Sequence, residues 1–231
     1  MSEAQQELSK TTRIGVIGGT GPQGRGLALR WAHAGMSVRI GSRDRENARS
    51  AAAEIRELVP SADIEGDANE AVAQWGEVVA IVVPWAGHRS TVEALREALR
   101  GKIVIDCVNP LGFDEKGAYA LPVEEGSATQ QAAALLPESR VVGAFHNVSA
   151  VLLSDLSSEV ACDVLVLGEA RADARIAQEL ADLIPGARGL YGGRLRNSAQ
   201  VEALTANLIS VNRRYKVHSG VRIAGLPSEQ G

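Results

Sequence analysis

The sequence contains few cysteines, few aromatic residues and no long apolar run. Its two cysteines, Cys107 and Cys162, fit neither a CxxC motif nor the ligand spacing of a metal site. We therefore expect no disulfide framework and no bound metal, and a reduced, cytoplasmic setting is the default. No apolar stretch approaches the roughly 20 residues of a membrane-spanning helix. The polar start MSEAQQELSKTT also lacks the apolar core of a signal peptide.

Neither sign of charge is in large excess. The chain of 231 residues has 24 Lys and Arg against 28 Asp and Glu, a net charge of −4. This balance gives no reason to expect nucleic acid or an anionic membrane as a partner. With 45% hydrophobic residues, the chain is long enough to bury a sizeable core. We expect small molecules as its partners, and the sequence leaves a homodimer open.

Short apolar stretches alternate with helical stretches over the first 150 residues. The pattern predicts strands at 13–18, 36–41, 62–66, 77–84, 102–108 and 140–145, with helices at 23–34, 46–58, 90–99 and 128–136. Near-continuous apolar strands between helices are typical of a parallel, doubly wound α/β sheet that is covered on both faces. We therefore predict a Rossmann-type domain over residues 12–150, preceded by a flexible extension of residues 1–11.

The same pattern restarts on a smaller scale after residue 150. Strands are expected at 162–168 and 187–192 around a helix at 173–184, and a long helix follows at 197–216. These elements predict a small C-terminal α/β domain over residues 151–231. The long helix carries an apolar stripe at helical spacing, which we expect to face the core. The stripe consists of Val201, Leu204, Leu208, Val211 and Tyr215.

The stretch GGTGPQG, residues 18–24, contains a G-x-G-x-x-G motif made by Gly19, Gly21 and Gly24. It directly follows a predicted strand and opens a predicted helix, which is the setting of a dinucleotide-binding turn. Pro22 suits the first turn of a helix, where its missing N–H costs nothing. The free N–H groups of that turn favour an anion. The motif therefore predicts a pyrophosphate site.

The second predicted strand ends in Gly41, Ser42 and Arg43, where NAD-binding folds usually place an acid. A guanidinium and a hydroxyl suit a 2′-phosphate better than a neutral diol. Asn47, one helical turn later, could border the same pocket. The pattern favours NADP over NAD. The alternative is that Arg43 only begins a charged helix start, RDRE.

Further polar and aromatic candidates follow three strand ends, where ligands bind in open α/β sheets. They are Pro84 and Trp85, Asn109 and Pro110, and the segment FHNVSA at 145–150. Together they indicate a flat, polar-edged partner against the nicotinamide. Each also has a purely structural interpretation. Trp85 would be a buried core residue, Asn109 and Pro110 a turn, and His146 a buried imidazole whose hydrogen bonds are all made within the protein. No tyrosine is followed four residues later by lysine, which argues against one large class of carbonyl reductases.

The stretches GGTGPQGRGLALR, GSRD, VVPW, FHNVSA and RNSAQVEALTANLISVN together resemble the family of coenzyme F420-dependent NADP oxidoreductases. The resemblance covers nearly the whole chain, from Arg13 to Leu226. It implies a Rossmann domain, a small C-terminal domain, and a deazaflavin in the cleft against the nicotinamide. Archaeal members tend to read His-Thr-Ile-Pro where this chain has His146, Asn147, Val148 and Ser149.

The resemblance also implies a role for each motif. Thr20 to Gln23 would hold the pyrophosphate, Ser42 and Arg43 the 2′-phosphate, Trp85 and Ala150 the nicotinamide end, and His146 to Ser149 the deazaflavin. Hydride would then pass directly between NADP(H) and coenzyme F420, so we expect no catalytic side chain. His146 is the candidate for a group that tunes the deazaflavin edge. The alternatives are an NADP-dependent reductase of a small imine or carbonyl, and a non-catalytic NADPH sensor.

Overall fold

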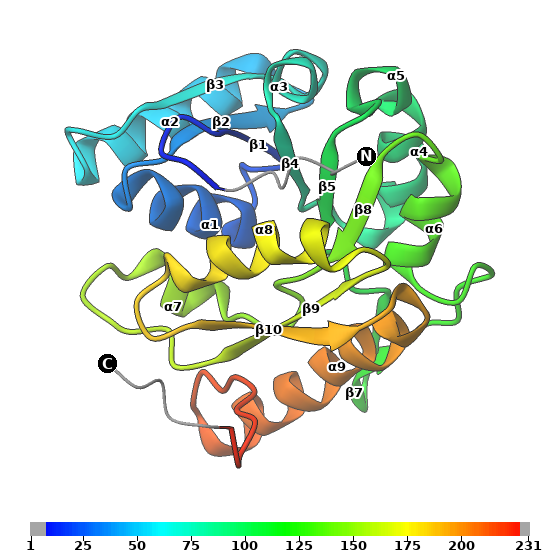
Figure 1. Cartoon of the computed structure of the whole chain (residues 1–231). Helices are drawn as coiled ribbons and strands as arrows, with labels where there is room; N and C mark the ends of the chain where they lie inside the picture. The colour runs from blue at the N-terminus through cyan, green and yellow to red at the C-terminus, as the bar shows by residue number, and fades with distance from the viewer. Residues whose placement is uncertain (1–7, 227–231) are drawn as a thin grey trace.

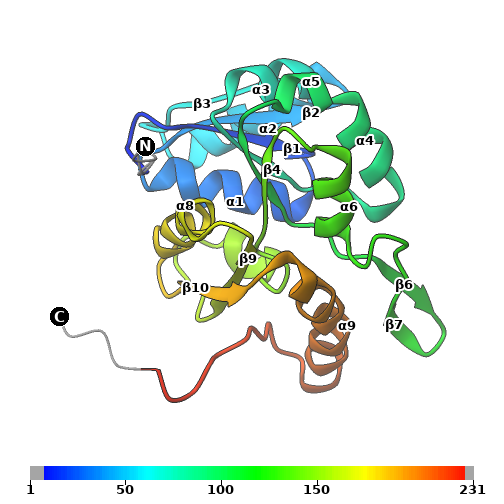
Figure 2. The same ribbon diagram turned by 45° about the vertical axis from the view of Figure 1, so that its right-hand side comes forward.

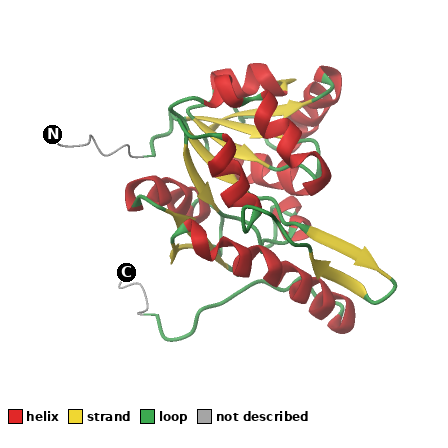
Figure 3. Ribbon diagram, turned by 90° about the vertical axis from the view of Figure 1, so that its right-hand side faces the viewer, coloured by secondary structure: helices red, strands yellow, loops and turns green. Residues whose placement is uncertain are grey.

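The computed structural model describes residues 8–226 and contains one eight-stranded sheet with helices on both faces (Figures 1 and 3). The strand order is β10-β9-β8-β5-β4-β1-β2-β3. The strands are β1 (Arg13–Ile17), β2 (Ser37–Ser42), β3 (Ile64–Ala68), β4 (Val78–Ile81), β5 (Ile103–Asp106), β8 (Arg140–Gly143), β9 (Asp163–Gly168) and β10 (Arg188–Gly193). The pairs from β8 through to β3 are all parallel. The predicted Rossmann-type α/β fold is confirmed.

The helices form two layers against the sheet. They are α1 (Pro22–His33), α2 (Arg45–Leu58), α3 (Asn69–Trp75), α4 (His88–Ala94), α5 (Arg96–Leu99), α6 (Ala128–Leu135), α7 (Ala150–Ser154), α8 (Arg171–Asp182) and α9 (Ser198–Tyr215). Strand β4 shows why its sequence is apolar throughout. Val78 and Ala80 belong to the core beneath α1, α2 and α8, while Val79 and Ile81 belong to the core beneath α3, α4 and α6. Successive side chains point to opposite faces, and both faces are buried.

The C-terminal strands β9 and β10 extend the same sheet, and the pair that joins them to it is not parallel. β9 is antiparallel to β8, and the two overlap only at the pairs Val142–Gly168 and Gly143–Leu167. The connection between β8 and β9, residues 144–162, holds only the five-residue helix α7, and it returns the chain to the sheet from the carboxyl end of β8. Because the overlap is so short, most of β9 lies beyond the carboxyl ends of the parallel strands (Figure 1). The domain boundary near residue 150 stays a prediction.

Several local features were not predicted. The loop after Pro110 forms a hairpin of β6 (Leu111–Asp114) and β7 (Gly117–Ala120). The hairpin projects from the body of the protein beside α9 (Figure 2). The prediction for the apolar stripe of α9 is wrong, because the buried residues of this helix are Ser198, Glu202 and Ala206. The first three members of the stripe are half-buried, and the last two, Val211 and Tyr215, are 38% and 70% exposed. Of the predicted N-terminal extension, residues 1–7 lie outside the described residues. Leu8, which follows them, donates its N–H to Glu179 of α8.

A buried arginine connects α1 to the segment after α7. Arg30 is 1% exposed, and its guanidinium donates hydrogen bonds to four main-chain carbonyls. The acceptors are Leu152, Leu153, Asp155 and Ser158. Gly26, one turn earlier, lets the helices approach closely, since a Cβ there would lie 2.5 Å from the Cβ of Leu153. The helix that begins at the glycine motif is thereby fixed to the start of the C-terminal segment.

A buried carboxylate holds the far end of that segment. Asp163, at the start of β9, has a fully buried side chain that accepts hydrogen bonds from Arg188, Arg222 and the N–H of Ile223. The hydrogen bond from Arg188 is the largest of the causes that lower the pKa of Asp163 to about 2. The carboxylate therefore stabilises the folded state only while it is ionised.

We predict a pH-dependent stability loss in Asp163→Asn. The folded-state pKa lies below the unfolded value, so the contribution is complete above about pH 5 and disappears as the pH falls toward 2. A shift of this size corresponds to roughly 2 kcal/mol. Urea unfolding of both proteins from pH 7 to pH 3 should show curves that converge in acid. A difference that is constant over this range would contradict the prediction.

Candidate active site

The largest concentration of predicted site residues lies in one cavity of about 950 Å³. It opens at the carboxyl ends of β1, β2, β4 and β5, where the strand order reverses between β1 and β4. This is the switch point at which open α/β sheets bind ligands. Eleven predicted site residues line it: Thr20, Gly21, Pro22, Gln23, Gly24, Ser42, Arg43, Asn47, Pro84, Trp85 and Asn109.

The glycine loop shapes the floor of the cavity. Gly18 has φ +73°, and a Cβ there would lie 2.6 Å from the carbonyl oxygen of Val82. Gly24 allows a close approach, because its Cβ would lie 2.7 Å from the Cα of Gly19. No side chain caps the start of α1 at Gly21, and Pro22 occupies its first turn. The uncapped helix start therefore presents N–H groups and a positive dipole end to an anion.

The end of β2 and the start of α2 supply one cation, one hydroxyl group and one amide, and no free acid. Ser42, Arg43 and Asn47 line the cavity. Asp44 lines it too, but its carboxylate accepts hydrogen bonds from the N–H groups of Glu46 (2.8 Å) and Asn47, and so caps α2. The acid nearest to the expected ribose position is thus occupied. This explains physically why the end of β2 suits a phosphate better than a diol.

The opposite wall is formed by the loops after β4 and β5. Trp85 follows β4 and stacks on the ring of His88, with centroids 5.5 Å apart and an angle of 28° between the planes. Asn109 follows β5 and donates from Nδ2 to the carbonyl of His146 at 2.8 Å. Its Oδ1 is buried and has no partner among the described residues. Pro110 does not line the cavity, since it begins the hairpin, where its carbonyl accepts from Leu121.

Residues 146–150 lie beside the cavity and do not line it. Asn147 donates to the carbonyl of Val201 and to the hydroxyl of Thr205, both at 2.9 Å, and so binds α9. Val148 is in the core, Ser149 caps α7 and Ala150 begins that helix. The segment therefore joins the end of β8 to α7 and α9.

His146 itself is 2% exposed. Neither ring nitrogen has a hydrogen-bond partner among the described residues. The ring lies next to Gly143, whose Cβ would be 3.0 Å from Nε2. Burial lowers the pKa of His146, against the opposing charges of Glu202 and Asp106. The imidazole is therefore held in its neutral form.

Some lining residues were not identified from the sequence. Asn69, at the start of α3, lines the cavity, and its Oδ1 accepts from the N–H of Gly18 at 3.4 Å. It follows a strand end, which was the available signal. His88 and Asp106 lie directly behind the cavity wall and were missed. His88 precedes the helix predicted at 90–99, and Asp106 lies inside the apolar run KIVIDCV. Gly19, a predicted member, packs beneath the loop against Ile40.

Other chemistries find no support among residues 8–226. No group of three or more His, Cys, Asp or Glu side chains there could hold a metal ion. Burial, and then the charge of Asp106, raise the pKa of Cys107 well above its usual value, so its thiol is no nucleophile. No helix of this part of the chain has the length and apolar character needed to cross a membrane.

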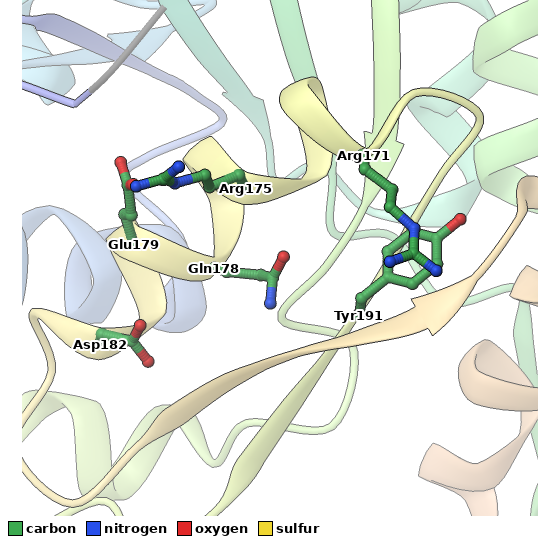
Figure 4. Close-up of a pocket in the computed structure, with 6 residues that line it drawn as sticks. All are labelled: Arg171, Arg175, Gln178, Glu179, Asp182 and Tyr191. Carbon is green, nitrogen blue, oxygen red and sulfur yellow. The ribbon is translucent and has the colours of Figure 1, made fainter. Parts of the chain in front are cut away.

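A second pocket, of about 560 Å³, lies on α8 and β10, away from the predicted site (Figure 4). Its charged side chains already have partners within the protein. Arg175 forms an ion pair with Glu179 at 2.7 Å, and the guanidinium of Arg171 lies 5.1 Å from the ring centre of Tyr191. None of the predicted site residues lines this pocket.

The chain is similar in sequence to a known family. The model of the family described as NADP oxidoreductase, coenzyme F420-dependent, matches residues 13–110. The chain is 40% identical to the F420-dependent NADP reductase of Methanothermobacter thermautotrophicus over 94% of this chain and 97% of that protein. It is 38% identical to the enzyme of the same name from Methanocaldococcus jannaschii over 93% of this chain and 99% of that protein.

Solved structures give the same result. A putative F420-dependent NADP reductase from Arthrobacter sp. FB24 superposes with a TM-score of 0.77 and 27% identity, over 92% of this chain and 99% of that one. The imine reductase of Bacillus cereus superposes with a TM-score of 0.61 at 17% identity, which shows a shared fold alone. On the full-length similarity to the archaeal proteins, the chain belongs to the family of coenzyme F420-dependent NADP oxidoreductases.

Proposed function

We propose that this protein transfers a hydride directly between NADP(H) and the deazaflavin coenzyme F420. The observation that carries the proposal is one cavity that collects the glycine loop, Ser42, Arg43 and Trp85. It does so in a chain that is 40% identical to an F420-dependent NADP reductase along almost its whole length. The protein is an oxidoreductase whose two substrates are both cofactors.

The NADP half of the site is assigned from the floor of the cavity. Thr20 to Gly24, at the uncapped start of α1, hold the pyrophosphate, with Gly19 supporting the turn from below. Ser42 and Arg43 hold the 2′-phosphate through charge-assisted hydrogen bonds, and Asn47 borders it.

The nicotinamide and the deazaflavin are assigned to the opposite wall. Trp85 and Pro84 bound the nicotinamide end, and the unpartnered Oδ1 of Asn109 is a free acceptor there. Ala150 also borders the nicotinamide end, and Pro110 and residues His146 to Ser149 adjoin the deazaflavin, on the side where α7 and α9 lie. Bound together, the cofactors supply the hydride donor and acceptor themselves. The chain aligns the two rings and excludes water, so no side chain is assigned as catalytic.

We also propose the cellular setting and the partners of the protein. Both cysteines are free thiols, which fits a reduced cytoplasm. We propose that the two cofactors are its only partners apart from a second copy in a homodimer, without nucleic acid. The Rossmann domain is proposed to end near residue 150, where α7 begins.

The direct test mixes the protein with NADPH and oxidised deazaflavin and follows the deazaflavin absorbance. The proposal requires bleaching that depends on the protein and is absent with NADH at the same concentration. Oxidation of NADPH by a small imine or carbonyl, without deazaflavin, would favour the alternative reductase. Binding of NADPH without reduction of deazaflavin or of a small imine or carbonyl would favour the non-catalytic NADPH sensor.

Two glycines should separate folding from binding. In Gly21→Ala the new methyl group meets only the carbonyl of Gly18 at 3.6 Å, so stability should change by less than about 0.5 kcal/mol. The same methyl faces the pyrophosphate, and NADPH binding should weaken about tenfold or more. In Gly24→Ala the clash with Gly19 at 2.7 Å should destabilise the protein by roughly 1–3 kcal/mol. Calorimetric titration and urea unfolding measure both effects, and a stable Gly24→Ala with full affinity would contradict this account.

Arg43 should determine the preference for NADP. Arg43→Ala, and more so Arg43→Asp, should weaken NADP by about 1.5–3 kcal/mol and leave NAD nearly unchanged. Arg45→Ala is the matched control, because Arg45 pairs with Asp67 at 2.6 Å and does not line the cavity. Equal losses for both nucleotides, or the same loss in the control, would show that Arg43 does not read the 2′-phosphate.

His146 should act on the deazaflavin side only. His146→Ala is expected to raise the Michaelis constant for deazaflavin or lower turnover, while the dissociation constant of NADPH is retained. Thermal unfolding of the variant is recorded alongside. A lower unfolding temperature combined with normal kinetics would assign this buried ring to the core instead.

A further inference from the structure

A buried ion pair lies directly behind the cavity wall. His88, the first residue of α4, and Asp106, the last residue of β5, both have side chains that are 0% exposed. Nε2 of His88 lies 2.6 Å from Oδ2 of Asp106. None of the roles assigned above uses this pair. A charge pair so deeply buried costs desolvation energy and needs good geometry with further hydrogen bonds.

The hydrogen-bond chain around His88 fixes its protonation. Nδ1 of His88 lies 2.9 Å from Oε1 of Gln131, and Nε2 of Gln131 donates to Glu125 at 3.0 Å. Glu125 is ion-paired with Arg89, and a hydrogen bond from Gln131 lowers its pKa, so it is an acceptor only. The amide of Gln131 must therefore turn its NH₂ to Glu125 and its carbonyl to His88. Nδ1 then carries a hydrogen, and Nε2 carries another when Asp106 is a carboxylate.

Other charges near His88 agree with this protonation. Burial by itself lowers the pKa of His88. The hydrogen bond and charge of Asp106 act in the opposite direction, as do Gln131 and the buried Glu202 of α9, and the net effect is a raised pKa. His146, the other buried imidazole near Asp106 and Glu202, has no hydrogen-bond partner on its ring, and its pKa is lowered. The pKa values of the two histidines are therefore shifted in opposite directions, and of the two rings only His88 has a carbonyl or carboxylate oxygen beside each nitrogen.

Both ends of the ion pair contact the cavity wall. The ring of His88 stacks on Trp85, at 5.5 Å between centroids, and an imidazolium is attracted to the face of an indole. On the other side, Oδ1 of Asp106 accepts the N–H of Val108 at 3.1 Å. Val108 and Trp85 line the cavity on neighbouring loops. The pair therefore connects the loop after β4 to the loop after β5.

We propose that the His88 imidazolium, paired with Asp106, is a positioning residue that holds Trp85 and the Val108–Asn109 loop at the nicotinamide end of the site. This rests on the proposed function only for the identity of the group that Trp85 faces. The pair acts through Trp85 and Val108 and does not touch the reacting atoms. Loss of the His88–Asp106 pair should disturb the alignment of the nicotinamide more than the affinity for NADPH, since the pyrophosphate and the 2′-phosphate are bound elsewhere.

The charge can be observed without any cofactor. The chain has four histidines, so nitrogen-detected NMR of the ¹⁵N-histidine protein, assigned with His88→Gln, resolves each ring. The proposal requires both His88 nitrogens to be protonated at pH 7.5. A neutral ring with one bare nitrogen would overturn it. Because no substrate is present, this result is independent of whether the protein reduces F420.

Asp106→Asn removes the charge and keeps the hydrogen bonds. The new amide can still accept from Val108, and it can donate to a neutral His88 that keeps its bond to Gln131. Turnover should fall by roughly tenfold, while the dissociation constant of NADPH stays within about twofold. The fluorescence of Trp85, isolated by difference from Trp85→Phe, should also change. Asp163→Asn is the matched control, an Asp→Asn change at a buried ion pair on β9.

The control should lose stability but keep turnover and Trp85 fluorescence. Equal kinetic loss in Asp106→Asn and Asp163→Asn would reduce the pair to a structural role and overturn the proposal. If Asp106→Asn fails to fold, the NMR result on the native protein decides alone. If the protein is active with another acceptor, the same comparison of turnover applies to that reaction.

Discussion

The buried guanidinium of Arg30 is the interaction on which the position of the C-terminal segment relative to the phosphate site depends. It donates to four carbonyls between Leu152 and Ser158, residues more than 120 positions later in the chain. A guanidinium without water is costly unless its donors are satisfied, and helix ends have spare carbonyls. The hydrogen bonds of Arg30 therefore satisfy both its own donors and these carbonyls. The helix that starts at the phosphate site is thereby fixed to the segment that closes the opposite side.

The rest of α1 adds contacts along the same face. Gln23 donates to the carbonyl of Phe145 at 2.7 Å, Gly26 admits Leu153, and Trp31 packs edge-on against the ring of Phe145. Positions 23, 26 and 30 repeat at helical spacing, so they lie on one side of the helix. The dinucleotide loop and residues 145–158 are therefore built as one rigid unit. A protein that aligns two rings for hydride transfer needs such rigidity, because small displacements slow the reaction.

Alternation of apolar and helical stretches was enough to predict the sheet, because strands buried on both faces leave a continuous apolar signal. The glycine motif and the end of β2 were also predictable, since their chemistry is local. The antiparallel entry of β9 was not, because it depends on the end of the sheet to which residues 144–162 return the chain, and no local pattern shows this. Nor was the role of Arg30, which reads in LALRWAH as an ordinary exposed helix residue. His88 and Asp106 were hidden for the same reason, since their partners come from other elements.

The account's central claim is that hydride passes directly between two cofactors held against the Trp85 wall. The most direct measurement follows deuterium from NADPH labelled at nicotinamide C4 into the reduced deazaflavin, by mass spectrometry and NMR in ordinary water. The account predicts that the label on one face of C4 is transferred completely to C5 of the deazaflavin, with none lost to solvent. Label that appears in water, or a reduced deazaflavin that carries only solvent hydrogen, would contradict direct transfer.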